Sequence, residues 1–341
     1  MTWKEVRSTV FGFLEESSCD HQERQDGVDW FVDGNRVQVT YTAAGEGENA
    51  SLRVEVRTNI GEFDQRYVDR ASTLAARLNG SLPLSVFVAE DSQVSLRLVL
   101  NLYSTGRTLF RFLRAAVLMQ AYYAKAAREL LHRESESVIG RGFEPACRVA
   151  SEGREYQSPA DELGASLLAS YVPSADAWLL QRWPVVRQHL IRVMEDCGFP
   201  LGWGNHEVQF FNPGPPDIAV AVLDPEHTKH GHLGRGFVVQ ARLLPPLEEL
   251  ETQPDDWYNA LNLALLKSGG SVLGGFTPAE RARTMGLAID LWVPCYALAH
   301  PSMGDRDLAI YLGNLVLHAA GASFELLRSG QLDLDPLFPT T

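Results

Sequence analysis

An order of helices and strands that occurs twice is the feature that most constrains the fold of this 341-residue chain. In residues 1–133, apolar residues spaced three to four apart predict a first helix, and apolar and polar residues then alternate in VDWFVDG, NRVQVTYT and ASLRVEVRT, which predicts three strands. The pattern next predicts a helix around 67–78, strands in PLSVFVAED and QVSLRLVLNLY, and a long helix over about 108–132. The first part of the chain therefore reads α-β-β-β-α-β-β-α.

The second half has the same order. It begins with a helix over 183–198, continues with strands in HEVQFFN, DIAVAVL and GFVVQARLL, and has another helix over 255–269. Strands in SVLGGFTPAE and TMGLAIDLWVP and a helix near 305–328 complete it. Local similarity supports a repeat, because ARLNGSLPLSVFVAED aligns with ALLKSGGSVLGGFTPAE with one gap. We therefore predict an α+β fold of two tandem α-β-β-β-α-β-β-α repeats, each an antiparallel sheet packed against helices.

Two short turns are predicted within the first copy. Asp33-Gly34-Asn35 links the first two strands and is typical of a hairpin. The last two strands of that copy are joined at Asp91-Ser92.

A change in composition marks the boundary between the copies. The stretch RESESVIGRGFEPACRVASEGREYQSPADE is rich in Ser, Glu, Gly and Pro and lacks sustained apolar periodicity, which is typical of an exposed connection. We predict a first repeat over 1–133, an acidic linker over 134–177 and a second repeat over 178–330, followed by a tail, 331–341. The linker is expected to hold a short helix that ends before Pro173.

This element order resembles the type III secretion chaperone-like fold, which is shared with the YbjN family. The resemblance covers residues 1–133 and 178–330 and lies in the pattern of elements, including a helix and small-residue turn that lead into two paired strands and a long final helix. It implies a non-enzymatic α+β sandwich. Secretion chaperones act as dimers that hold an extended segment of a partner, so two tandem copies would resemble a covalently joined pair. No catalytic motif and no site residue is carried over from either family.

Charge and targeting signals narrow the classes of partner. With 30 Lys and Arg against 43 Asp and Glu, the formal net charge is −13. A chain with this charge lacks the basic surface of a nucleic-acid-binding protein and is repelled by anionic membranes. The sequence has no apolar run of about 18 residues and no signal-peptide core. Its four cysteines show no CxxC spacing, which suits a reducing compartment. We therefore expect a cytoplasmic, bacterial-type protein without a cofactor, whose partner is another protein.

Three sets of side chains are candidates for contact with that partner. On a helical wheel of 108–132, Leu118 and Tyr122 lie on the charged face of the predicted helix. In the last helix, Ile310, Leu317 and Phe324 form an apolar stripe beside the core stripe, and small residues border it. Outward-facing residues on two equivalent strands would line a groove on the sheet, and these are Trp292, Asp290 and Arg97. The alternative is that each long helix is buried on two sides within its own domain.

A cluster of histidines supports a second hypothesis. The loop HTKHGH contains His227, His230 and His232 beside Asp224 and Glu226, and imidazoles at this density can bind a divalent metal. Their spacing is not that of a known closed metal site, so a solvated polar loop explains them equally well.

The sequence thus predicts a non-enzymatic chaperone or adaptor that captures a segment of another protein along a strand edge or an apolar groove. It would work as a homodimer or as an intramolecular pseudo-dimer. One alternative is a metal-dependent or small-molecule enzyme that uses the histidine loop. Another is a regulator that acts through dimerisation only.

Overall fold

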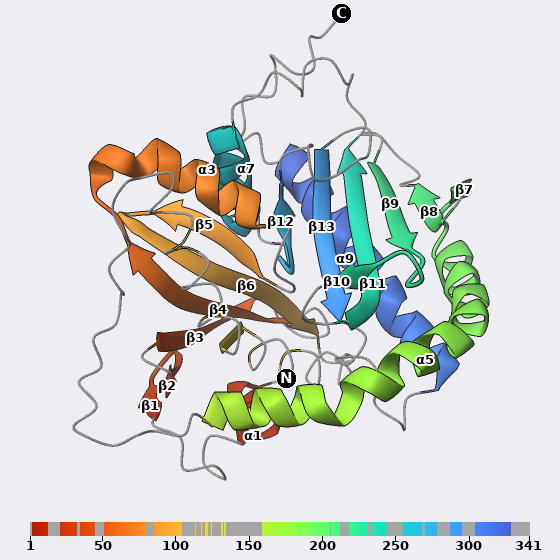
Figure 1. Cartoon of the computed structure of the whole chain (residues 1–341), viewed down its shortest axis with the longest axis horizontal. Helices are drawn as coiled ribbons and strands as arrows, with labels where there is room; N and C mark the ends of the chain where they lie inside the picture. Colours follow the sequence, from red (N-terminus) through yellow and green to blue (C-terminus); the bar gives the residue numbers. More distant parts are fainter. Residues whose placement is uncertain are drawn as a thin grey trace, which may run out of the picture. The chain divides into compact units, whose positions relative to one another are not determined.

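The computed structural model of the chain contains helices and antiparallel sheets, which confirms the α+β class (Figure 1). It divides into two compact units, 1–75 with 84–167 and 76–83 with 168–341. The structure describes residues 2–12, 21–32, 35–44, 51–79, 85–103, 113, 117, 120–121, 124, 131, 133, 159–204, 206–211, 218–230, 234–243, 255–267, 270–277, 287–294 and 304–328.

The first unit is built around one antiparallel sheet in the order β1-β2-β3-β4-β6-β5. Its strands are β1 (His21–Arg24), β2 (Gly27–Val32), β3 (Asn35–Ala44), β4 (Ser51–Glu62), β5 (Val86–Glu90) and β6 (Gln93–Tyr103). Helix α1 (Trp3–Val10) precedes the sheet, and α3 (Val68–Leu78) follows a 3₁₀ turn after β4.

Both short turns predicted for this unit join paired strands. Val32 of β2 lies opposite Asn35 of β3, and Glu90 of β5 lies opposite Gln93 of β6. Asp91 and Ser92 have φ angles of 53° and 60°. Positive φ at both central residues is what a two-residue hairpin turn needs in order to match the twist of its strands. The structure confirms both predicted connections.

Alternation along β4 separates an apolar face of the first sheet from a polar one. Leu52, Val54 and Val56 are buried, whereas Arg53 and Arg57 between and beyond them are only half-buried. Helix α1 packs on the apolar face, where the ring of Trp3 stacks on that of Tyr41 with centroids 4.5 Å apart. The buried Gln120 donates a hydrogen bond to the carbonyl oxygen of Leu96, 2.9 Å away. Apolar and polar side chains therefore leave the sheet on opposite sides, as the sequence pattern predicts.

The second unit also contains one antiparallel sheet, in the order β7-β8-β9-β11-β13-β12. Its elements are α5 (Pro159–Asp196), which belongs to this unit from residue 168 onward, β7 (Leu201–Gly204), β8 (Glu207–Phe211), β9 (Ile218–Leu223), β10 (Lys229–His230), β11 (Gly234–Leu243), α7 (Asp255–Lys267), β12 (Gly275–Phe276), β13 (Leu287–Pro294) and α9 (Asp305–Arg328). Strand β10 pairs with β11 and lies off the main path. Apart from β10, the strand order of this sheet is the same as that of the first.

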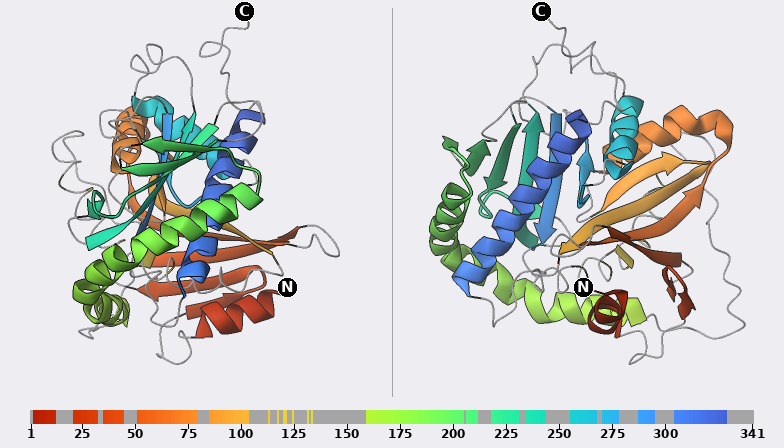
Figure 2. Two further views of the ribbon diagram at one scale, coloured as in Figure 1. Left: turned by 90° about the vertical axis from the view of Figure 1, so that its right-hand side faces the viewer. Right: turned by 180° about the vertical axis from the view of Figure 1, so that it is seen from behind.

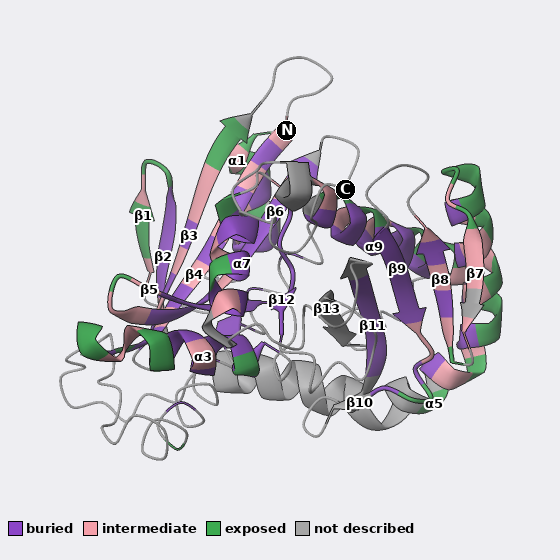
Figure 3. Cartoon of the chain, turned by 90° about the horizontal axis from the view of Figure 1, so that it is seen from above, coloured by how far each residue is buried: buried purple, intermediate pink, exposed green. Residues whose placement is uncertain are grey.

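Helix α9 covers one face of the second sheet and is itself covered in part by α5. It lies against β9, β11 and β13, and its buried stripe contains Leu308, Leu312, Leu315, Val316 and Ala319 (Figures 2 and 3). At Gly313 a methyl group would lie 3.1 Å from Cγ1 of Val193 on α5, tighter than nearly all such contacts. Glycine at this position therefore lets the two helices approach closely.

The structure differs from the predicted elements in two ways. A single helix, α5, runs through Pro173 and Pro184, where the sequence predicts a short helix ending before Pro173 and a separate helix from 183. A proline inside a helix removes one hydrogen bond and costs about 3 kcal/mol, and burial of Trp183, Val186, Leu190 and Met194 on the same helix opposes that cost. Strands β1, β7 and β10 were not predicted, because each has at most four residues, too few to show a sustained alternation of apolar and polar residues.

A glycine on β2 offers a test of the first sheet. A Cβ on Gly27 would lie 1.8 Å from the carbonyl oxygen of Val39 on the paired strand β3. We expect Gly27→Ala to lower the free energy of unfolding by about 3 kcal/mol, because backbone must move to admit the methyl group. Urea denaturation measures this change. Gly12→Ala is the matched control, since nothing lies within 4 Å of its Cβ position, and an equal loss in both variants would contradict the register.

Candidate functional site

The large apolar side chains that are exposed in the described part of the chain lie on two helices of the second unit. Val185 of α5 and Ile310 and Leu317 of α9 expose 44%, 40% and 36% of their surface. Phe324, one further heptad along α9, is half-buried. We call these four residues the α5–α9 apolar surface.

The α5–α9 apolar surface contains all three residues that the sequence predicts on the last helix. Gly313, which borders the predicted stripe, is occupied by α5, whereas a Cβ on Gly321 would meet nothing within 4 Å. The helix that packs closely against a small residue of α9 is thus α5, and it does so at Gly313 but not at Gly321. Sequence reasoning missed Val185. Its signal is its position on the helix, next to the buried Val186 but on the side roughly opposite Trp183, Leu190 and Met194.

Two of the other predicted sets fall wholly or partly outside the described residues. Leu118 and Tyr122 lie outside the described residues. Trp292 lies on β13 opposite Val238, and Asp290 lies opposite Gln240, with both side chains outside the described part of the structure.

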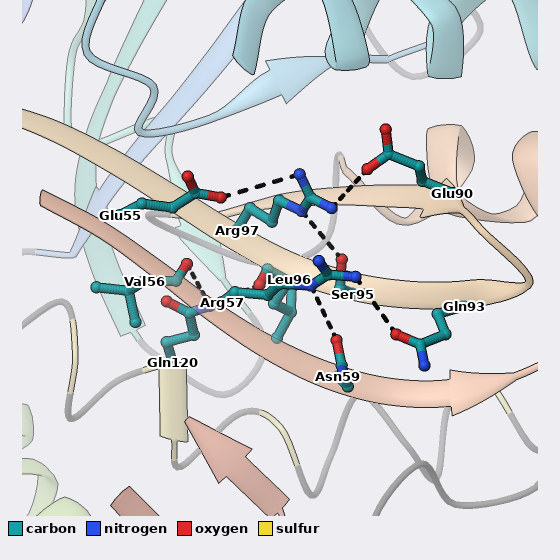
Figure 4. A network of polar contacts seen from close by, with 10 residues as sticks. All are labelled: Glu55, Val56, Arg57, Asn59, Glu90, Gln93, Ser95, Leu96, Arg97 and Gln120. Atoms are coloured by element: carbon teal, nitrogen blue, oxygen red, sulfur yellow. Dashed lines mark hydrogen bonds and ion pairs between the residues drawn. The ribbon is translucent and has the colours of Figure 1, made fainter. Parts of the chain in front are cut away.

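Arg97 belongs to a polar network on the first sheet (Figure 4). Its Nη2 donates a hydrogen bond to Oε2 of Glu90 at 2.6 Å, and its Nη1 lies 3.9 Å from Oε1 of Glu55. Its Nε donates to the hydroxyl oxygen of Ser95 at 3.3 Å. Because two carboxylates already face it and only 11% of its side chain is exposed, the charge of Arg97 is balanced within its own unit.

Arg57 lies opposite Arg97 in the pairing of β4 with β6, and its surroundings differ. Its Nε donates to Oδ1 of Asn59 at 3.0 Å and its Nη2 to Oε1 of Gln93 at 3.3 Å, both uncharged acceptors (Figure 4). Desolvation lowers the pKa of the Arg57 guanidinium, and the positive charge of Arg97 lowers it further. This side of the first sheet is therefore a structured hydrogen-bonding surface whose cations are held in fixed positions.

A buried carboxylate continues the same polar face toward β1. Asp29 is 1% exposed, and its oxygens lie 2.5 Å from Nη2 of Arg36 on β3 and 3.2 Å from Nε of Arg24 on β1. The pairing places Asp29, Gln38, Arg57 and Arg97 in one row across four strands. Strand pairing thus brings together polar residues that are far apart in the sequence.

Of the three histidines in the loop that the sequence offers as a metal site, the structure describes the side chain of one, His227. His227 is exposed in the turn after β9, His230 lies on β10 with its side chain outside the described part, and His232 lies outside the described residues. The ring that meets His227 is that of His206, between β7 and β8, with centroids 3.8 Å apart. Among the residues that the structure describes, no group of three or more His, Cys, Asp and Glu is placed to hold a metal ion.

Asp224 ties these turns to α5. Its Oδ1 accepts a hydrogen bond of 2.7 Å from Nε1 of Trp183 and lies 3.9 Å from Nη1 of Arg187. Its backbone N–H donates to the carbonyl oxygen of His206, and its carbonyl oxygen accepts from the N–H of His227. A single residue after β9 thus holds two turns and the helix that carries Val185.

Comparisons with protein-family models, with curated proteins and with solved structures find no match to this chain. The resemblance to secretion chaperones and the YbjN family stays a prediction. In the described part of the chain, no helix is both long and apolar enough to cross a membrane.

Removal of the Asp224 carboxylate tests its role as the anchor of α5. A hydrogen bond to a charged group contributes about 2 kcal/mol to stability, so we expect Asp224→Ala, which leaves no acceptor for Trp183, to lower the free energy of unfolding by about that amount. Combination with Trp183→Phe should cost less than the sum of the two single changes, because both remove the same bond. Urea denaturation of the four proteins measures this. Glu195→Gln, at an exposed position of α5, is the control, and strict additivity of the pair would contradict the anchor.

His318 of α9 makes stability depend on pH. Burial lowers the pKa of its imidazole below the usual 6.5, so the folded protein favours the neutral ring. The unfolded chain therefore binds a proton at higher pH, and the stabilisation present above pH 6.5 is lost as the pH falls toward the folded-state pKa. We expect the urea midpoint to fall less between pH 8 and pH 5.5 in His318→Gln than in the wild type. An equal fall in both proteins would contradict this expectation.

Proposed function

We propose that this chain is a non-enzymatic, cytoplasmic chaperone or adaptor that captures a segment of another protein on the α5–α9 apolar surface. The observation that carries the proposal is the exposure of Val185, Ile310 and Leu317 on two helices that pack against each other. Burial of apolar surface on a partner is favourable by about 25 cal/mol per Å². Such a surface gains stability when a partner covers it.

Two mechanisms of capture follow from the sequence, pairing at a strand edge and burial in an apolar groove, and we favour the second because the edges at β12 and β1 are poor sites for pairing. Asn262 of α7 donates to the carbonyl oxygen of Phe276 and accepts from its N–H, at 3.0 and 2.7 Å, so its amide occupies the backbone groups of β12. Strand β1, at an edge of the first sheet, has four residues with the exposed side chains of Gln22 and Glu23. Short, charged or covered edges resist the addition of another strand.

We further propose that the two units are copies of one ancestral unit. The same strand order in both sheets supports this. In the sequence, moreover, helix α3 connects β4 to β5, and α7 connects β11 to β12, at the same place in each order. A pair of copies in one chain fits the resemblance to dimeric secretion chaperones. In the second copy, the helices α5 and α9 would then provide the capture surface.

A binding experiment with matched charge changes tests the proposed function. We expect tagged wild-type protein to recover a stoichiometric protein partner from its native cytoplasm, and the double variant Ile310→Glu/Leu317→Glu to lose it at least tenfold, because two buried charges oppose the contact. Quantitative mass spectrometry of the eluates measures the recovery. Ala260→Glu, at an exposed position of α7, is the control for added negative charge and should keep the partner.

The same experiment separates the alternatives. If the double variant keeps the partner while its circular dichroism is unchanged, capture on this surface is wrong. If the wild type recovers only further copies of itself, and its mass in solution is that of a dimer, the regulator that acts through dimerisation replaces the proposal.

A further inference from the structure

We propose that His206 and His227 form a binding site for a divalent transition-metal ion of the Zn²⁺ class. The two exposed imidazole rings lie 3.8 Å apart between centroids, with their planes inclined at 48°. They come from turns separated by two strands in the sequence, so the pair is a product of the fold. This site is independent of the proposed capture of a protein.

The backbones that carry the two imidazoles are held in place. The N–H of Asp224 donates to the carbonyl oxygen of His206 at 2.9 Å, and the N–H of His227 donates to the carbonyl oxygen of Asp224 at 3.0 Å. The side chain of Asp224 is bound by Trp183. At the other end of the turn, the buried Thr228 donates a hydrogen bond from its hydroxyl to the carbonyl oxygen of Gly236 on β11. The backbone is therefore fixed, while the exposed rings can rotate.

The separation of the rings suits a shared ion. Zinc binds histidine nitrogen at about 2.0–2.1 Å, so two nitrogens on one tetrahedral zinc lie about 3.4 Å apart. Two rings already in van der Waals contact reach this arrangement by side-chain rotation alone. Because the described residues provide no third ligand in place, water would fill the remaining positions, and the ion would be bound reversibly. Imidazole nitrogen favours Zn²⁺, Cu²⁺ and Ni²⁺ over Mg²⁺, which prefers oxygen.

Titration calorimetry with Zn²⁺ alone at pH 7.5 tests the site. We expect one ion per chain in the wild type and an affinity at least about tenfold weaker in His206→Ala and in His227→Ala, since even loss of a residue that supports a ligand costs this much. His189→Gln, on α5, is the control and should bind as the wild type does. Mg²⁺ in excess should not compete. Circular dichroism confirms that each variant is folded.

One variant distinguishes this pair from the histidine loop of the sequence. His232→Ala should leave the zinc affinity unchanged if His206 and His227 hold the ion. If His232→Ala weakens binding and His206→Ala does not, the site belongs to the loop and the proposal is wrong. Absence of zinc binding by the folded wild type, or full competition by Mg²⁺, also overturns it. None of these outcomes depends on capture of a protein partner.

Discussion

Antiparallel pairing in the first sheet assigns each side chain of a strand to one of two faces, and the organisation of this unit depends on it. Val56 lies opposite Leu98 and Arg57 lies opposite Arg97, so the apolar and polar residues of neighbouring strands stay in register. A slip of one residue would turn the guanidinium of Arg57 into the core and Val56 out of it. The hairpin at Asp91 and Ser92 holds β5 against β6, which keeps Glu90 within reach of Arg97.

In the second unit, helix α9 packs against two neighbours, the sheet and helix α5. The buried stripe of α9 packs on the sheet, and Gly313 on another side admits α5. A helix that meets a sheet and a crossing helix cannot bury its whole circumference, and Ile310 and Leu317 are left exposed beside the contact. Asp224 keeps α5 in place through Trp183, so the apolar surface depends on an interaction at the end of β9. This dependence connects the core of the unit to its proposed function.

The sequence predicts the features that local chemistry determines and misses those that pairing creates. Alternation in β4 and the residues of the two turns are enough to predict strands and their connections, and the stripe of Ile310 and Leu317 follows from helical spacing. Proline signals misled the prediction at α5, where one helix continues through Pro173. The contact of His206 with His227 has no signal in the sequence, because it arises only when two turns separated by two strands share hydrogen bonds with Asp224. The surroundings of Arg57 were missed for the same reason, since the register of β4 and β6 places it opposite Arg97.

Photo-cross-linking from position 317 in living cells tests the central claim most directly. A benzoylphenylalanine placed at Leu317 reacts only with chains that contact the α5–α9 apolar surface, and the same residue at Ala260 on α7 reports the background. The account predicts a discrete adduct with a different protein from position 317 and none from position 260. An adduct at neither position, or the same adducts at both, would contradict it.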